Sequence, residues 1–462
     1  MKTITTPIIP TKQTFFKVDA PHDLDLQAIC VFAAIGFFLD ADTYFKDTKV
    51  LRPGTEYTLD DSDKILDAKT YFNWHYTPRD ISFNQVLEEY KILFEKIVSE
   101  QALDKQVILP LSGGLDSRTQ AVALKKIGAE VFSYSYDFEN GYPETKIAKH
   151  IAKTCGFNFQ DYKINKGYLW SVIEDLAKIN GCYSDFTSPR QMAILNEFEN
   201  MGDVFSLGHW GDVLFDSMNL PALTHQAQVD ALMNKLLKRG GLEFATSLWK
   251  LWELEGHFKD YFRHRISALL HTININDTNA KLRAFKSKYW APRWTSVNLS
   301  IFSKAKPITL PYYDDRMCEF ICTVPEEYLK NRQLQIAYIK QSAPELAKIE
   351  WQDHRPFNLC NYHLNKSPYN LPYKIINKLK RELKGLSGNP YVQRNWELQF
   401  LGTDNTYFLK KNILESGLET WIPLSFLKAQ LNAFFQGNSL RQAHSISILL
   451  TLSLFNQKHW HA

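Results

Sequence analysis

The chain has 462 residues, of which 45% are apolar and 23% charged, proportions typical of an ordinary globular protein rather than a disordered or fibrous one. Domains commonly have about 150 residues, so a chain of this length is predicted to form two or three domains. The net charge of +4 gives no strongly basic field over this length, so we expect small-molecule or protein partners and no nucleic acid.

The cysteines and the apolar segments indicate a soluble, cytoplasmic protein. The six cysteines are scattered, with no C-x-x-C pair and no zinc-ligand spacing. The N-terminal stretch "MKTITTPIIP" lacks the apolar core of a signal peptide. The longest apolar run, "AICVFAAIGFFL", has 12 residues, whereas a membrane-spanning helix needs roughly 20. We therefore expect no membrane partner.

The hydrophobic pattern predicts strands and helices that alternate up to about residue 225, and mainly helices beyond it. Residues 1–75 have the pattern of short strands and turns, and a helix is predicted from residue 84. Further strands are predicted at 106–111, 130–136, 158–164 and 203–208, with helices at 118–129 and 142–156. This alternation is typical of an α/β fold in which helices cover both faces of a parallel sheet.

The stretch "LPLSGGLDSR", residues 109–118, joins a predicted strand to a predicted helix. Gly113 and Gly114 let the backbone approach phosphate oxygens with no Cβ in the way, and a helix N-terminus offers unpaired N–H groups to an anion. Ser112 and Ser117 add hydroxyl donors, and Asp116 is explained if it holds a cation. The sequence therefore predicts a site for a nucleotide polyphosphate with magnesium.

The sequence of this loop matches neither the P-loop motif G-x-x-x-x-G-K-[ST] nor the dinucleotide-binding motif G-x-G-x-x-G. It resembles S-G-G-x-D-S, the pyrophosphate loop (PP-loop) of the N-type ATP pyrophosphatases, which cleave ATP between its α- and β-phosphates. Asparagine, GMP, NAD and argininosuccinate synthetases share this loop with tRNA-modifying thiolases and lysidine synthetases. The resemblance implies a five-stranded parallel sheet.

Further landmarks resemble asparagine synthetases in particular. "LGHWGDVLF", residues 207–215, is similar to the family motif S-G-E-G-x-D-E-L-F, and "LPYYDDRMCEFICTVPEEYLK", residues 310–330, to the V-P-F-L-D stretch and its helix. Residues 335–357 resemble the helical segment that comes next in the family. This resemblance covers roughly residues 80–360, and it implies an ATP-dependent ligase that adenylates a carboxylate and transfers an amine or ammonia to it, leaving AMP and pyrophosphate.

Residues 35–59 resemble the last strands of a class II glutamine amidotransferase domain. In complete members a nucleophilic cysteine follows the initiator methionine, but position 2 here is Lys2, and Cys30 lies in an apolar run that favours a buried, inert thiol. We expect residues 1–78 to be a truncated β-rich remnant without glutaminase activity, residues 79–365 the ATP pyrophosphatase domain, and residues 366–462 a mainly helical extension. Nitrogen would arrive as ammonia or an amine, with a separate glutaminase as one source.

The resemblance assigns roles to residues of this chain. Asp116 and Asp212 are expected to bind Mg²⁺. The predicted catalytic residues are His209, Arg118 and Arg355. The predicted ATP-binding residues are Leu111, Ser112, Gly113, Gly114, Leu115, Asp116, Ser117, Ser135 and Gly208.

Three positions depart from the family pattern. His209 replaces a glutamate, and it could act as a general base or only shape the acceptor pocket. Val213 replaces a second glutamate. The stretch "QDHRPF", residues 352–357, has no lysine where the family uses one, so Arg355 is the candidate there. These departures argue against free aspartate as the substrate and leave a sugar acid, an amino acid or a peptide.

Two other functions remain open from the sequence. One is a non-catalytic nucleotide-binding protein that kept the fold, and the other is a tRNA-modifying PP-loop enzyme, although neither a cysteine pair nor a basic field supports it. The basic stretch 373–385 is predicted to form an amphipathic helix with a solvated charged face.

Overall fold

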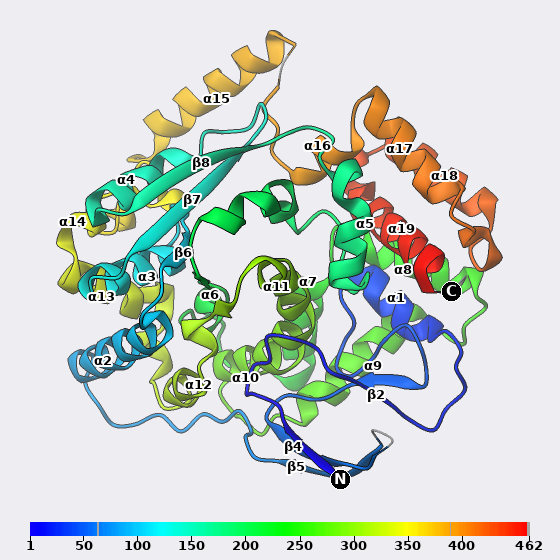
Figure 1. The fold of residues 1–462 in the computed structure, drawn as a ribbon, viewed down its shortest axis with the longest axis horizontal. Coiled ribbons are helices and arrows are strands. Elements are labelled where there is room, and N and C mark those ends of the chain that lie inside the picture. The colour runs from blue at the N-terminus through cyan, green and yellow to red at the C-terminus, as the bar shows by residue number, and fades with distance from the viewer. Residues whose placement is uncertain (62–63, 389, 460–462) are drawn as a thin grey trace.

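A five-stranded parallel sheet in the order β10-β9-β6-β7-β8 lies at the centre of the computed structural model, which describes residues 1–61, 64–388 and 390–459 (Figure 1). All four neighbouring pairs are parallel, which confirms the predicted sheet. Its strands are β6 (Val107–Pro110), β7 (Val131–Phe138), β8 (Asn158–Ile164), β9 (Val204–Ser206) and β10 (Ile308–Thr309).

The helices predicted around this sheet are present. Helix α2 (Phe83–Ala102) begins with a capping box, in which Ser82 Oγ accepts from the Gln85 N–H and the Gln85 side chain accepts from the Ser82 N–H. Helix α3 (Leu115–Lys126) packs against β6, and α4 (Thr145–Cys155) packs against β7 and β8. In Figure 1, α11 (Ser296–Ala305) lies on the other side of the sheet from α3 and α4.

The apolar run near the N-terminus is a helix, α1 (Leu26–Ile35), and not the strands and turns expected there. Asp25 caps it by accepting from the Ala28 N–H, and Gly36 ends it at φ +83°. Ala28 to Ile35 are all buried, so the helix carries no polar face from which a helical period could be recognised. A short, wholly apolar run is therefore ambiguous between strand and helix until its packing is known.

The remaining N-terminal segment is β-rich, as predicted. A three-stranded antiparallel sheet joins β1 (Lys2–Thr5), β4 (Thr55–Leu59) and β5 (Ile65–Thr70), and a second sheet pairs β2 (Phe15–Lys17) with β3 (Thr48–Val50). This segment shares its core with the later helices. Helix α1 packs against α8 (Gly241–Leu251), and the ring of Tyr44 stacks on Phe455 with centroids 3.7 Å apart.

The second half of the chain is mainly helical, as predicted. Among the described residues, no helix combines the length and the apolar character needed to cross a membrane. The other helices, besides several short 3₁₀ turns, are α5 (Leu169–Asn180), the 3₁₀ segment η1 (Arg190–Asn200), α6 (Gly211–Leu214), α7 (His225–Leu236), α9 (Phe258–His271), α10 (Thr278–Phe285), the π-helical segment η2 (Lys286–Thr295), α12 (Asp315–Ile321), α13 (Gln333–Ser342), α14 (Pro344–Ala347), α15 (Leu371–Leu386), α16 (Asn395–Phe400), α17 (Thr403–Leu414), α18 (Leu424–Gln436) and α19 (Ser439–His459).

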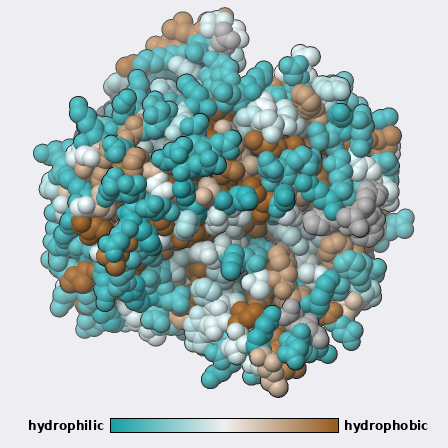
Figure 2. Space-filling model, in the orientation of Figure 1, coloured by the Kyte–Doolittle hydropathy of each residue, from teal (hydrophilic) through white to brown (hydrophobic). Residues whose placement is uncertain are grey.

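Helix α15 projects from the body of the molecule (Figure 1) and has no buried residue. Its apolar face is solvent-exposed as well as its basic face, with Ile375, Leu379 and Leu383 each 57–67% exposed. Brown side chains mark this helix at the top of Figure 2. The predicted amphipathic helix is confirmed, but no other part of the described chain covers its apolar face.

Candidate active site

The carboxyl ends of β6 and β9 border a cavity of about 1070 Å³. In a parallel sheet this is the edge at which ligands bind. A single ligand commonly occupies a cavity of about 300–1000 Å³, so this one has room for a nucleotide beside a second substrate. Its walls come from some of the residues in each of the segments 110–117, 207–219, 286–295, 331–332 and 351–362, together with Gln191, Lys235 and Phe302.

The predicted phosphate loop borders this cavity and is held in a tight turn. The Ser117 hydroxyl accepts from the Ser112 N–H at 3.1 Å, and the Ser112 hydroxyl accepts from the Gly114 N–H at 3.2 Å. Gly113 packs on Gln352 and donates its N–H to Gln352 Oε1 at 3.0 Å; a Cβ on Gly113 would lie 2.8 Å from the Gln352 Cβ. No side chain caps the N-terminus of α3 that follows. The N–H groups of its first turn are therefore available to an anion.

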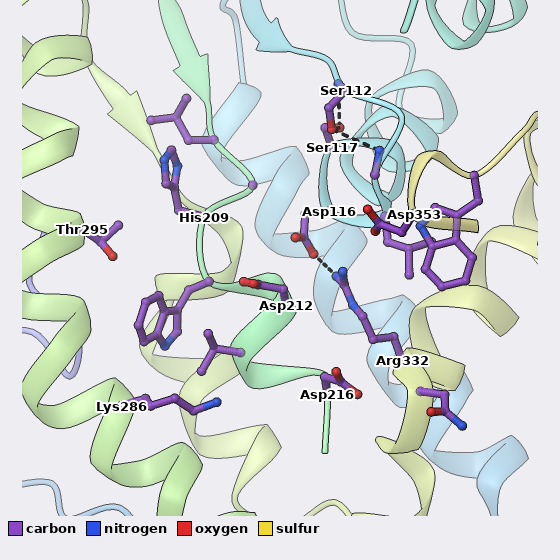
Figure 3. Close-up of a pocket in the computed structure, with 18 of the residues that line it drawn as sticks. Ser112, Asp116, Ser117, His209, Asp212, Asp216, Lys286, Thr295, Arg332 and Asp353 are labelled. Carbon is purple, nitrogen blue, oxygen red and sulfur yellow. Dashed lines mark hydrogen bonds and ion pairs between the residues drawn. The ribbon is translucent and has the colours of Figure 1, made fainter. Parts of the chain in front are cut away.

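Asp116, in the first turn of α3, faces the cavity and is held by two partners. Its carboxylate forms an ion pair with Arg332 and accepts from Gln335 Nε2 at 3.1 Å (Figure 3). Burial raises the pKa of Asp116 to about 6, while Arg332 opposes this rise and the carboxylate of Asp212 adds to it. The two aspartates thus lie close enough to feel each other's charge, which is the condition under which a shared cation is bound.

Asp212 lies at the start of α6, with its carboxylate beside that of Asp116 (Figure 3). Its position depends on Gly211, because a Cβ there would overlap the Asp116 carboxylate and lie 2.8 Å from the Tyr312 ring. Magnesium is commonly held by one or two protein carboxylates together with substrate phosphates. Two facing aspartates fit that pattern, although the described residues contain no cluster of three or more metal-ligating side chains.

His209 lines the cavity beside Phe302, with ring centroids 6.0 Å apart. Burial lowers the pKa of His209 to about 4, which Asp212 only partly offsets. The imidazole is therefore neutral at pH 7. A base is weak when its conjugate acid has a low pKa, so His209 would be a weak general base. This geometry favours the second of the two roles expected for His209, that of shaping the acceptor pocket.

Trp210 adopts the left-handed backbone conformation, at φ +75°. Bulky residues rarely do so, and the position corresponds to the second glycine of the motif S-G-E-G. Its indole N–H donates to Ser287 Oγ at 3.0 Å, and its ring meets Trp290 edge-on at 6.3 Å. The loop after β9 is thereby connected to η2, and the two segments form one wall of the cavity.

Other predicted site residues do not face the cavity. Arg118 is fully buried, and its guanidinium donates to four backbone carbonyls, so it is not placed to contact a substrate. Arg355 does not line the cavity, whereas His354 before it does. Ser135 lies on β7 and Leu111 after β6, both buried and outside the cavity lining. Gly208 and Leu115 line it, and their part in ATP binding stays a prediction.

Among the charged residues of the cavity that were not predicted from the sequence are Asp216, Lys286 and Arg332. Arg332 reaches Asp116 from a position 216 residues along the chain. Lys286 enters from η2, and Asp216 from the loop after α6. None stands in a recognisable motif. Only Asp216 lies close in sequence to a predicted site residue, four positions after Asp212 and just beyond the end of α6.

The family model for asparagine synthase matches residues 89–343. Among solved structures, the NMN synthetase from Francisella tularensis is similar at 14% sequence identity and a TM-score of 0.23, covering 45% of this chain and 92% of that one. The comparison with curated protein sequences gives no match.

Proposed function

Because this chain belongs to the asparagine synthase family, we propose that it is an ATP-dependent ligase that adenylates a carboxylic acid and passes the acyl group to an amine or ammonia. The products are an amide, AMP and pyrophosphate. One observation carries the proposal: the loop Ser112–Ser117, the uncapped start of α3 and two facing aspartates border a single cavity.

Each part of this arrangement has a role in the first step. The N–H groups at the start of α3 and the Ser112 and Ser117 hydroxyls would bind the β- and γ-phosphates, which leave as pyrophosphate. Asp116 and Asp212 would hold Mg²⁺, which supplies charge neutralisation along the triphosphate. Arg332 would move its charge from Asp116 toward the phosphates as they bind. The carboxylate oxygen of the acid then attacks the α-phosphorus.

The second step takes place on the side of the cavity lined by His209 and Trp210. The nitrogen nucleophile attacks the acyl carbon, AMP leaves, and the nucleophile gives up one proton. His209 and Val213 stand where the asparagine synthetase pattern has glutamates, so the acid is not free aspartate. We propose that the nitrogen is supplied as free ammonia, by a separate glutaminase, or as an amine, in the cytoplasm.

Pyrophosphate release tests the proposal. Wild type and Asp116→Asn are compared with ATP, Mg²⁺, ammonium and a panel of amino acids, sugar acids and peptides. Release that requires one class of acid and is lost in Asp116→Asn supports an adenylating ligase. Tight ATP binding without release for any acid would instead favour a nucleotide-binding protein without catalysis.

A further inference from the structure

Lys286 is exceptional among the buried basic residues of the described chain. Four basic side chains are no more than 7% exposed: Arg118, Arg283, Lys286 and Arg293. Arg283 pairs with Glu326, Arg293 donates to the carbonyls of Asp40 and Asp42, and Arg118 donates to carbonyls. Lys286 alone of the four has neither a hydrogen bond nor an ion pair within the described residues.

An ammonium in this state is costly, because burial removes water and no described side chain replaces it with a hydrogen bond or a close ion pair. The carboxylates of Asp212 and Asp216 act on it only at longer range and compensate part of the cost. Lys286 is 7% exposed and lines the cavity. Its ammonium points into the cavity, to the side on which Asp212 and Asp216 lie (Figure 3). Burial, reinforced by Arg283 and opposed by the carboxylates of Asp212 and Asp216, lowers the pKa of Lys286 to about 8, so most of the side chain is still charged at pH 7. A buried charge that faces a cavity is compensated when an anion binds there.

The cavity that Lys286 lines has walls of two kinds. Trp210, Trp290 and Trp294 supply flat apolar surfaces. Asp216, Ser217 and Asn219 supply hydrogen-bonding groups on the loop after α6. Flat surfaces beside acceptors and donors suit a ring that carries hydroxyl groups on its edge and exposes apolar C–H groups on its faces.

We infer that Lys286 binds the carboxylate of the acyl substrate and that this substrate is a polyhydroxylated acid, that is, a sugar acid. The inference rests on the proposed function for the identity of the site, but it concerns binding and not turnover. Lys286 is a substrate-contacting residue, and the three indoles bind the faces of the sugar ring.

Binding is measured by calorimetry with Mg²⁺ and α,β-methylene ATP present, so that no adenylation occurs. Three probes test the carboxylate contact and the hydroxylated ring separately. Glucuronate has both features. Cyclohexanecarboxylate has the ring and the charge but no hydroxyls, and glucose has the hydroxyls but no carboxylate. Glucuronate should bind at least tenfold more tightly than either. Equal binding of cyclohexanecarboxylate would overturn the sugar class, and equal binding of glucose would overturn the carboxylate contact.

Lys286→Met should weaken glucuronate binding at least tenfold, and Lys286→Arg should restore part of it. The control is Lys288→Met on the same segment, since Lys288 lies over the Tyr289 ring outside the cavity lining. Lys286→Met should unfold no more easily than wild type, because it removes an unpaired buried charge. Lost stability with unchanged glucuronate binding would show a structural lysine and overturn the inference.

The outcome also separates this inference from the proposed function. Glucuronate binding that depends on Lys286, without pyrophosphate release from ATP, would support the subsite and contradict the ligase. Pyrophosphate release with another class of acid, unaffected in Lys286→Met, would support the ligase and overturn the subsite.

Discussion

Replacement of Arg118 by methionine tests whether this residue is structural or contacts substrate. The guanidinium donates to the carbonyls of Glu350 at 2.6 Å, Ile349 at 3.0 Å, Gly113 at 3.2 Å and Leu346 at 3.3 Å. It therefore joins the phosphate loop to the segment after α13. Methionine replaces the aliphatic stem of arginine but has no donor, so all four carbonyls lose this partner.

The expected loss follows from these contacts. A net contribution of about 1 kcal/mol for each hydrogen bond gives about 4 kcal/mol in all. Part of this is offset because the buried charge disappears, and burial already lowers the pKa of Arg118 to about 10. We expect Arg118→Met to lower the free energy of unfolding by about 3 kcal/mol, measured by urea titration with tryptophan fluorescence. Arg118→Lys should recover only part, since a single ammonium cannot reach four separated carbonyls.

The matched control is Lys125→Met on the same helix. Lys125 is exposed and pairs with Glu345 at 2.7 Å, an exposed ion pair whose loss costs at most about 1 kcal/mol. If Arg118→Met unfolds at the wild-type urea concentration while pyrophosphate release disappears, Arg118 acts on substrate and the structural reasoning is refuted.

Three further predictions follow from the site and its surroundings. Gly211→Ala should reduce pyrophosphate release at least tenfold, because its Cβ displaces Asp116, whereas Gly385→Ala on open helix surface should leave release unchanged. Since the folded pKa of His209 lies near 4, below the unfolded value near 6.5, its contribution to stability is present above pH 6.5 and declines toward pH 4. From pH 7 to pH 5 the free energy of unfolding should therefore fall by about 2 kcal/mol less in His209→Phe than in wild type, as measured by urea titrations at the two pH values. An equal fall in both proteins would contradict a buried neutral imidazole. Leu379→Ser should change the free energy of unfolding by less than about 0.5 kcal/mol, because this side chain is 57% exposed, and a larger loss would mean that α15 packs on the body.

Local signals explain what could be predicted from the sequence. The strand, glycine turn and helix around residues 107–126 follow one another directly, so short-range periodicity and turn chemistry sufficed for the loop and the sheet. Arg118 shows the limit of this reasoning. It follows Ser117 in sequence, but one residue along a helix is a rotation of about 100°, and its side chain turns away from the cavity.

Long-range placement explains what could not be predicted. Arg332 and Lys286 enter the site from segments whose own patterns are those of ordinary helices, and only the packing of η2 and of the turn before α13 brings them to Asp116 and Asp212. Arg332 also has left-handed backbone, at φ +59°, which sequence gives no reason to expect of an arginine.

The two sides of the cavity differ in how far they keep the family pattern, and this difference bears on the acid that is bound. On the phosphate side the loop matches S-G-G-x-D-S throughout. On the other side Trp210 holds a left-handed conformation that costs about 1–2 kcal/mol, offset by its hydrogen bond to Ser287 and its contact with Trp290. Those contacts fix η2, which carries Lys286. Under the proposed function, ATP would be bound mainly by backbone groups of a loop that keeps the family pattern, whereas the acid would be bound by side chains of the loop after β9 and of η2, and its identity would depend on them.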